Sequence, residues 1–242
     1  MTFDPFGDFE TAGYLQNVLR LKEPDEIKRS EHLSFELSIE DALSYLAQTK
    51  IIDYPVILKV HEILFSDFYP WAGKDRHELV PHLAVFKGSK DNPHHTAFER
   101  PDFIRKAIDY ALQLVADKKR FRERPGEVMG LLAFAHPFLD GNGRTILLVF
   151  MELAFRAGFA INWSETNKDD YLRALSDEIR DPSQRYLDNY LIPFVINISS
   201  RNDWPKIIGG IKGLDGLDKE NISYGSLDDP EIQRIYLTCR AQ

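Results

Sequence analysis

Residues 136–144 read His136-Pro137-Phe138-Leu139-Asp140-Gly141-Asn142-Gly143-Arg144, and an apolar segment lies on either side of them. The first segment runs from Val128 to Ala135 and the second from Thr145 to Ala157. A proline and two glycines between such segments predict a helix, a tight loop and a second helix. Gly141 and Gly143 allow a positive φ or a close approach of a ligand to the backbone. We therefore expect the chemistry of this protein at the loop.

The polar groups of this stretch are those that phosphate chemistry needs. The free N–H groups at the start of the second helix form an anion site, because they carry the positive end of the helix dipole. Arg144 adds a cation suited to phosphate oxygens, and Asp140 is a ligand of the kind that Mg²⁺ shares with phosphates. His136 titrates near neutral pH and can take a proton from a hydroxyl. The stretch predicts phosphoryl or nucleotidyl transfer; a chance helix–turn–helix with a core histidine is the alternative interpretation.

The same stretch resembles the signature of Fic-domain proteins, His-Pro-Phe-x-[Asp/Glu]-Gly-Asn-Gly-Arg-x-x-Arg. Each defined position matches from His136 to Arg144, and Leu147 stands in place of the final arginine. Residues 68–73, Phe-Tyr-Pro-Trp-Ala-Gly, and residues 8–15, Asp-Phe-Glu-Thr-Ala-Gly-Tyr-Leu, also resemble segments of the family. The likeness runs in the family's usual order, from about residue 8 to about residue 195.

The resemblance implies an enzyme that transfers AMP, or another nucleoside monophosphate, from ATP or another nucleoside triphosphate to a Tyr, Thr or Ser hydroxyl of a target protein. His136 is expected to take the hydroxyl proton, and Asp140 to hold the cofactor Mg²⁺. Gly141, Asn142 and Gly143 are expected to bind the phosphates through backbone N–H groups. The side chains of Asn142 and Arg144 are expected to assist them. A toxin or effector role is a further expectation.

Leu147 leaves the donor open, because the family's second arginine reaches the terminal phosphates of ATP and a leucine cannot bind phosphate. Relatives without that arginine include Doc-type toxins, which phosphorylate, and members that transfer phosphocholine. The alternatives are therefore a Fic-fold phosphoryl or phosphocholine transferase, or a catalytically weak Fic fold that acts as a peptide-binding module. The presence of His136 and Asp140 argues against the binding module.

Residues 69–100 interrupt the helical pattern with prolines and glycines and predict a short β-hairpin over about residues 76–87. In the Fic family this region is a flap that holds the target segment by strand addition. The residues expected to dock the target are His77, Glu78, Leu79, Val80 and Lys87. The histidines His77, His82, His94 and His95 lack the spacing of a zinc site, so a solvated polar loop is the favoured interpretation.

Helical periodicity elsewhere predicts a mainly all-α fold, a Fic-type helical bundle with the hairpin flap near the active site. We expect residues 1–52 to form a helical segment that packs on the core, residues 53–199 the Fic core, and residues 200–242 a tail or small appendage. A last core helix is expected over about residues 183–198. His61, on the apolar face of a helix, is expected to be a packed or capping histidine rather than a catalyst.

The composition limits the partners and the compartment. The chain has 242 residues and a net charge of −8, which argues against nucleic acid as the main partner. The most apolar stretch is interrupted by Glu152 and Arg156, so no membrane partner is expected. The single cysteine, Cys239, and an N-terminus without a secretory pattern predict a cytoplasmic protein; a translocated effector would look the same.

Many Fic proteins carry an inhibitory motif, [Ser/Thr]-x-x-x-Glu-[Gly/Asn], whose glutamate pairs with the second arginine. The nearest stretch here is residues 216–221, Gly-Leu-Asp-Lys-Glu-Asn, with glycine where the hydroxyl residue is needed. The tail is therefore expected to be a remnant or unrelated to inhibition. A separate antitoxin chain is the alternative source of an inhibitor.

Overall fold

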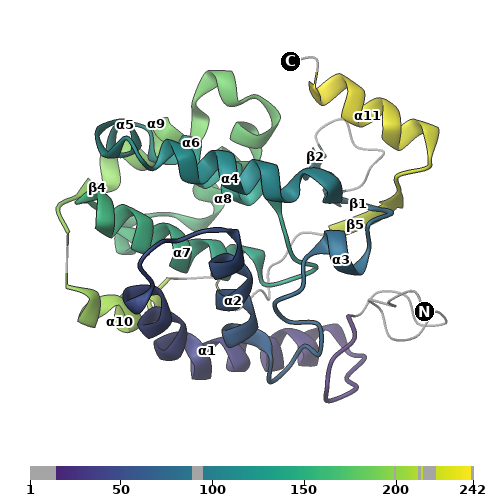
Figure 1. The fold of residues 1–242 in the computed structure, drawn as a ribbon, viewed down its shortest axis with the longest axis horizontal. Coiled ribbons are helices and arrows are strands. Elements are labelled where there is room, and N and C mark those ends of the chain that lie inside the picture. Colours follow the sequence, from purple (N-terminus) through teal and green to yellow (C-terminus); the bar gives the residue numbers. More distant parts are fainter. Residues whose placement is uncertain (1–14, 89–94, 199, 212–213, 215–221, 241–242) are drawn as a thin grey trace.

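Two helices, α6 (Pro125–Ala135) and α7 (Asn142–Ala157), lie at the centre of the fold and enclose the loop of residues 136–141 (Figure 1). The structure is a computed structural model and describes residues 15–88, 95–198, 200–211, 214 and 222–240. The resemblance segment of residues 8–15 and the stretch 216–221 lie outside the described residues, apart from Leu15. The predicted order of helix, tight loop and helix is confirmed.

The ends of the two central helices follow from local chemistry. Pro125 occupies the first turn of α6, where its missing N–H removes no helical hydrogen bond. The Asp188 carboxylate accepts hydrogen bonds from the backbone N–H groups of Gly126, at 2.8 Å, and Glu127, at 3.2 Å. A remote side chain thus serves as the N-terminal cap of α6. α7 ends at Gly158, which adopts the left-handed conformation with φ of 92°.

The N-terminal helices cover one side of α7. α1 (Pro24–Gln48) packs against both α2 (Tyr54–Phe65) and α7, and it is one continuous helix without a break at Ser38. Arg156, near the end of α7, donates from Nη2 to the carbonyl oxygens of Leu46 (2.8 Å) and Thr49 (2.7 Å), so it satisfies the C-terminal turn of α1. The core face of α1 consists of Ile27, Phe35, Ile39, Ala42, Leu43 and Leu46.

The remaining helices of the core cover α6. It contacts α4, α5, α8 and α9. These helices are α4 (Ile104–Leu114), α5 (Lys118–Glu123), α8 (Lys168–Arg180) and α9 (Tyr186–Leu191). Short 3₁₀ turns connect them: η2 (Pro101–Phe103), η3 (Trp163–Glu165), η4 (Pro182–Gln184), η5 (Ile192–Phe194) and η6 (Arg201–Asp203).

The last core helix is shorter than predicted. α9 ends at Leu191, because the proline at 193 cannot continue the helical hydrogen bonds and a 3₁₀ turn follows. The chain then forms β4 (Val195–Ile196), which pairs antiparallel with β3 (Ala160–Ile161). The predicted helix over residues 183–198 is therefore wrong in its second half.

The flap differs from the predicted hairpin over residues 76–87. Its first part is a short helix, α3 (Arg76–Leu79), because the Asp75 carboxylate accepts the N–H of Glu78 and favours a helical turn. Its second part is β1 (Leu83–Lys87), the middle strand of a sheet with the order β2-β1-β5. Both neighbours of β1, β2 (Thr96–Ala97) and β5 (Ile222–Ser226), run antiparallel to it.

The C-terminal residues pack on the molecule at two places. α10 (Trp204–Gly209) buries Trp204 and Ile208 in the main core, with the Trp204 ring edge-on to Phe155 at 5.6 Å. α11 (Pro230–Arg240) lies against the flap, where Ile232 and Tyr236 join Ala84 and Phe86 in a second, smaller core (Figure 1). The segment expected as a tail or appendage thus completes both a helical layer and a sheet.

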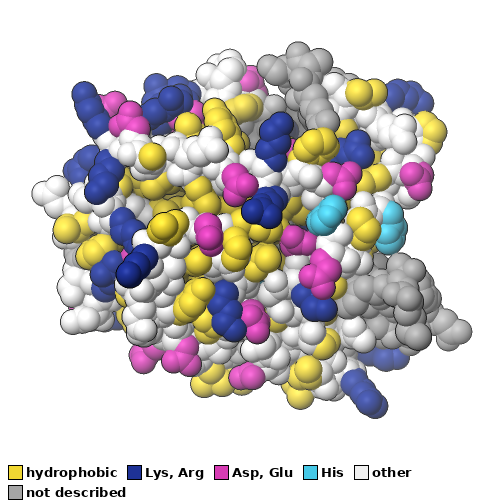
Figure 2. Space-filling model, viewed as in Figure 1, with side chains coloured by type: hydrophobic (Ala, Val, Ile, Leu, Met, Phe, Trp, Pro, Cys, Tyr) yellow, Lys and Arg dark blue, Asp and Glu magenta, His cyan; other side chains and the backbone are white. Residues whose placement is uncertain are grey.

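The surface shows a mixture of charges. On the face drawn in Figure 2, lysine and arginine side chains alternate with aspartate and glutamate, and hydrophobic side chains lie between them. Within the described residues, no helix is both long enough and apolar enough to cross a membrane.

Candidate functional site

His136 lies at the C-terminal end of α6 in a strained backbone conformation. It caps the helix with φ of 43°, a left-handed value that is uncommon outside glycine. Its ring stacks on Phe98, with 3.8 Å between centroids and 14° between planes, and the residue is half-buried. This turn ends α6 and holds the imidazole against the Phe98 ring at the start of the loop of residues 136–141.

Arg76 stabilises this turn through hydrogen bonds to carbonyl oxygens. Its Nε donates to the His136 carbonyl oxygen and its Nη2 to that of Glu99, each at 2.7 Å. Its backbone N–H donates to the Pro137 carbonyl oxygen, also at 2.7 Å. The side chain is fully buried, and this burial lowers the pKa of Arg76 to about 10, so it keeps its charge at neutral pH. The role of Arg76 cannot be recognised from the sequence, because nothing in its neighbours reveals which remote carbonyl groups it contacts.

Asn142 fixes the shape of the loop. Its side-chain amide accepts from the Phe138 N–H at 2.9 Å and donates to the Phe138 carbonyl oxygen at 2.8 Å. Both ends of the amide are therefore used inside the loop, and the residue is buried. The Phe138 contact uses one of the two amide hydrogens, so the expected donation from this side chain to phosphate stays a prediction beside that of the Asn142 backbone N–H.

His61 supports the loop from α2. Its Nδ1 accepts the N–H of Gly73 at 2.9 Å, which assigns the proton to Nε2, and Nε2 lies 3.0 Å from the Asp140 carbonyl oxygen. Its ring stacks on Phe138 with centroids 3.7 Å apart. Burial lowers the pKa of His61 to about 3, and it is neutral at physiological pH. The expectation of a packed rather than catalytic histidine agrees with this geometry.

The two loop glycines serve different purposes. Gly141 has φ of 74°, and a Cβ built on it would lie 2.5 Å from Cε2 of Phe65. Gly143, in the first turn of α7, is exposed, and a Cβ there would meet nothing within 4 Å. Gly141 is thus required by the fold, whereas Gly143 leaves open space beside the start of α7.

The start of α7 is suited to an anion. The N-terminal cap, Gly141, has no side chain to accept the first N–H groups of this 16-residue helix. Asp140 lies directly before it, half-buried, with its Oδ1 accepting the Gly141 N–H at 2.7 Å. The described residues contain no group of three His, Cys, Asp or Glu that could hold a metal ion. One carboxylate still fits Mg²⁺, since this ion commonly takes one or two carboxylates and completes its shell with phosphates and water.

Arg144 is paired with an acidic side chain of α1. Its Nη2 donates to the Glu31 carboxylate of α1, and both side chains are buried. The guanidinium also lies 4.9 Å from the centroid of the Phe65 ring. Its Nη1 is buried and has no hydrogen-bond partner among the described residues. Part of the guanidinium is thus committed to Glu31, while Nη1 offers buried N–H groups for the phosphate-binding role predicted from the sequence.

Leu147 belongs to the core. It lies in the first two turns of α7 and is only 6 % exposed. An apolar side chain therefore packs where the family signature has its second arginine, and this position supplies no charge to a nucleotide.

The residues expected to dock a target differ in their exposure to solvent. His77 and Glu78 are exposed on α3, and His77 Nδ1 lies 3.5 Å from an Asp102 oxygen. Leu79 and Val80 are buried in the main core, so their side chains face inward and not toward a target. Lys87, at the end of β1, donates to the Ser176 hydroxyl at 3.3 Å. His94, of the predicted polar loop, lies outside the described residues.

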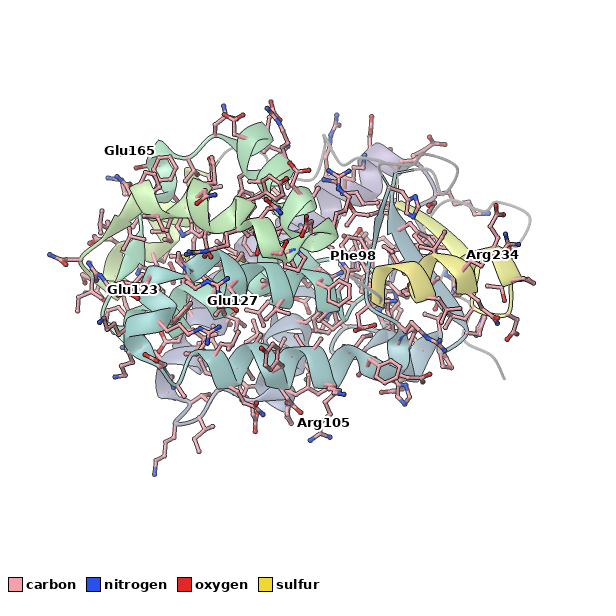
Figure 3. The ribbon with its side chains drawn as sticks, turned by 90° about the horizontal axis from the view of Figure 1, so that it is seen from above. Phe98, Arg105, Glu123, Glu127, Glu165 and Arg234 are labelled. Carbon is pink, nitrogen blue, oxygen red and sulfur yellow. The ribbon has the colours of Figure 1, made fainter. Side chains whose placement is uncertain are left out.

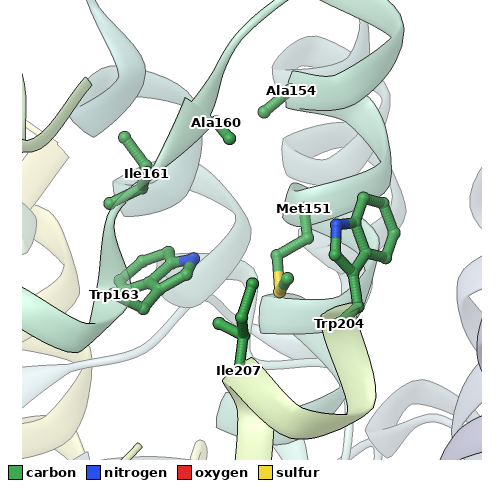
Figure 4. A pocket seen from close by; sticks show the side chains of 7 residues that line it. All are labelled: Met151, Ala154, Ala160, Ile161, Trp163, Trp204 and Ile207. Carbon is green, nitrogen blue, oxygen red and sulfur yellow. The ribbon is translucent and has the colours of Figure 1, made fainter. Parts of the chain in front are cut away.

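An apolar pocket lies away from the loop, beside the second half of α7 (Figure 4). Its polar lining atoms are indole nitrogens and backbone, and it offers no cation to a phosphate. It is a packing gap where α7, β3 and α10 meet. The lining residues are Met151, Ala154, Ala160, Ile161, Trp163, Trp204 and Ile207.

We expect the stability of the protein to fall as the pH drops below 6.5, because His61 is neutral in the fold but protonates in the unfolded chain. Its folded pKa of about 3 lies below the ordinary 6.5, so this loss extends through the window between the two values. Between pH 6 and 5 the free energy of unfolding should fall by roughly 1 kcal/mol per pH unit. Urea unfolding at several pH values measures it. His61→Gln should flatten this slope; an unchanged slope in His61→Gln would contradict the assignment.

Gly141→Ala and Gly143→Ala are expected to differ sharply. The first forces a left-handed alanine against the Phe65 ring and should lower the free energy of unfolding by at least about 2 kcal/mol. The second places a methyl group in open space on a helix and should leave stability nearly unchanged. Chemical denaturation of the two variants measures both. Equal losses would show that the loop is not packed on Phe65 as described.

Comparison with known proteins places this geometry in a family. Residues 51–154, which include α2, the flap, α6 and most of α7, match the model of the Fic/DOC family. Over 181 residues the chain is 32% identical to protein adenylyltransferase VbhT of Bartonella schoenbuchensis, a match that covers 71% of this chain and 35% of that protein. The chain thus spans about a third of the length of that relative. It is 22% identical to the probable protein adenylyltransferase Fic of Escherichia coli, over 66% of this chain and 77% of that protein.

Solved structures share the fold. The BepC effector protein of Bartonella tribocorum with bound AMPPNP aligns with a TM-score of 0.62 and 18% identity, over 76% of this chain and 93% of that one. The N-terminal Fic domain of a putative cell filamentation protein of Bartonella quintana with bound ADP aligns with a TM-score of 0.64 and 19% identity, over 78% and 94%. With the helix–loop–helix, the complete nine-residue stretch and these likenesses together, the chain carries a Fic/DOC domain over residues 51–154.

Proposed function

We propose that the chain transfers a nucleoside monophosphate, with AMP as the first candidate, from a nucleoside triphosphate to a hydroxyl side chain of a protein. One observation carries the proposal: an imidazole fixed by Phe98 and Arg76 stands at one end of a loop whose other end is an uncapped helix start. The same short loop thus holds both His136, the proposed base, and the anion site at the start of α7. Two relatives named protein adenylyltransferases support AMP as the group transferred.

In the proposed reaction the hydroxyl oxygen attacks the α-phosphorus. The new P–O bond forms as the bond to the β-phosphate breaks, and pyrophosphate leaves with the electron pair. His136 takes the hydroxyl proton during the attack, a role typically worth about 10²–10⁴-fold in rate. Backbone N–H groups of Asn142 and Gly143 stabilise the negative charge that develops on the phosphoryl oxygens.

Asp140 is the residue that would hold Mg²⁺, and the bound ion would neutralise phosphate charge. Arg144 would donate to a phosphate through its buried Nη1, which has no hydrogen-bond partner among the described residues, while its Nη2 is paired with Glu31. The packing of Leu147 favours a looser hold on the terminal phosphates than in a site with two arginines, and it is the observation that keeps phosphoryl transfer as the second candidate.

The partners in this proposal are a nucleoside triphosphate, a target protein with a hydroxyl side chain and, as an inhibitor, a separate antitoxin chain. The bound AMPPNP and ADP in the two Bartonella structures support an adenine nucleotide. The effector names of those relatives make export of this chain a second possibility beside a cytoplasmic site of action.

Intact-mass spectrometry tests the proposal. The purified chain is incubated with Mg²⁺, a cell lysate and one donor at a time, chosen from ATP, GTP, UTP, CTP and CDP-choline. His136→Ala serves as the inactive control. A nucleoside monophosphate added by the wild type alone supports nucleotidyl transfer and names the donor. A phosphate or phosphocholine adduct would overturn it in favour of the second class, and no adduct from any donor would overturn transfer altogether.

A further inference from the structure

The flap already holds a strand in the position where a target segment would be added. β5 pairs antiparallel with the whole of β1, from Leu83 opposite Ser226 to Lys87 opposite Ile222. β2 covers the other edge at Phe86 and Lys87. β5 comes from the C-terminal part of the same chain and is bonded by backbone groups, as in peptide recognition by strand addition.

The two faces of this strand pair meet different parts of the protein. Ala84 and Phe86 face α11, where they pack with Ile232 and Tyr236. Gly225, opposite Ala84, belongs to this face, because a Cβ on it would lie 2.1 Å from Cδ1 of Ile232. Since side chains alternate along a strand, Tyr224 points to the other face, toward the loop.

The surroundings of Tyr224 agree with this direction. It is opposite Val85 in the register, is half-buried, and packs against the main core. Its phenol interacts electrostatically with Asp140 and Arg76, and burial raises its pKa well above the ordinary value. Asp140 and Arg76 are the loop carboxylate and the arginine that holds His136. A protonated tyrosine hydroxyl of this chain therefore lies beside the proposed catalytic loop.

The C-terminal segment of residues 222–240, which contains β5 and α11, also contacts Phe98, the residue that supports the proposed base. The Tyr236 hydroxyl donates to the Phe98 carbonyl oxygen at 2.8 Å, and the Phe98 ring stacks on His136. At the other end of β5, the Ser223 hydroxyl donates to the Gly88 carbonyl oxygen at 2.8 Å. Figure 3 shows Phe98 beside the helix that carries Arg234. Hydrogen bonds thus hold the segment both at α11 and at β5, and β5 keeps Tyr224 in a fixed position.

We propose that Tyr224 is an acceptor hydroxyl of this chain itself, presented by β5 for intramolecular modification at the loop of residues 136–144. This inference rests on the proposed nucleotidyl transfer. The Tyr224 oxygen forms a bond to the α-phosphorus of ATP, the bond to the β-phosphate breaks, and pyrophosphate leaves. The phenolic proton passes to His136.

The other hydroxyls near the flap are less suited. Ser223 lies on the α11 face of the strand and is engaged with Gly88. Ser226 is exposed at the end of the strand. The Tyr54 hydroxyl donates to the Asp75 carboxylate, and Tyr69 is buried in the main core. Ser226 shares the loop-facing side with Tyr224 but is exposed at the strand end, so Tyr224 alone among these five is half-buried on that side.

The test uses the full chain with Mg²⁺ and ATP, followed by peptide mapping of any adduct. Wild type and Ser223→Ala, the matched control on the same strand, should carry one AMP on residue 224, and Tyr224→Phe should lose it. The fraction modified per unit time should not depend on protein concentration, because the reaction is intramolecular. An adduct that maps elsewhere, persists in Tyr224→Phe or forms faster in proportion to concentration would overturn the proposal.

A parallel measurement separates this inference from the proposed function. Transfer of AMP from labelled ATP to lysate proteins is followed for the wild-type chain. Labelled lysate proteins without an adduct on Tyr224 would overturn the acceptor role alone. If neither the lysate nor the chain is labelled by ATP, both AMP transfer and the acceptor role fail together.

Discussion

His136→Ala is expected to lower the rate of nucleotide transfer by about 10²–10⁴-fold, the usual contribution of a positioned base. The loss should fall on the chemical step, because the imidazole lies at the loop mouth while the anion site at the start of α7 is left in place. Nucleotide affinity should therefore change little. Single-turnover kinetics with labelled donor, together with a binding isotherm, measure the two effects separately.

Two further variants make this result specific. His136→Asn keeps a residue that tolerates the left-handed backbone but cannot act as the base, so it should be as slow as the alanine variant. Phe98→Leu keeps the base and removes only its aromatic support, and should cost far less rate. A His136→Asn chain with nearly wild-type rate would contradict the role of His136 as the base.

Glu31→Leu is expected to lower the free energy of unfolding by about 3–5 kcal/mol, because it leaves the buried Arg144 guanidinium without its counter-ion. Arg144→Met should cost a similar amount by removing the counter-ion of the buried carboxylate. The double variant should recover much of the loss, since a buried ion pair replaced by apolar side chains is often nearly neutral. Urea unfolding of the four chains gives the coupling energy as a double-mutant cycle.

The same double variant tests the remaining phosphate role of Arg144. If its Nη1 binds a phosphate, the folded double variant should bind nucleotide at least about tenfold more weakly, since each lost charge-assisted hydrogen bond is worth roughly 1.5–3 kcal/mol. Unchanged affinity would make Arg144 a residue of the fold alone. In the unfolding experiment, a double variant whose loss of stability equals the sum of the two single losses would contradict the buried pair of Glu31 and Arg144.

The sequence carries enough information for the centre of the fold. Residues 136–144 predict the turn, its glycines and the two helices, because a left-handed cap and a helix start depend on neighbours within a few positions. His61 could be recognised as a packed residue from the apolar face on which it lies. The end of α7 at Gly158 follows from the glycine alone.

The contacts that refine the site are remote and could not be predicted in this way. Glu31 is 113 positions from Arg144, so the sequence presents Arg144 as a phosphate ligand and the fold presents it as half of an ion pair. Arg76 meets the His136 carbonyl from 60 positions away. The hairpin was misplaced because Asp75 caps a helical turn and β5, far along the chain, completes the sheet.

The cap that Asp188 places on α6 has a consequence for where the protein can be divided. The residues that match the family model end at 154, whereas Asp188, 62 positions beyond Gly126, accepts the first N–H groups of α6. A fragment limited to 51–154 would leave those buried donors without an acceptor and would also lack Glu31. The region matched by the family model is therefore smaller than the region whose contacts complete the helices of the site.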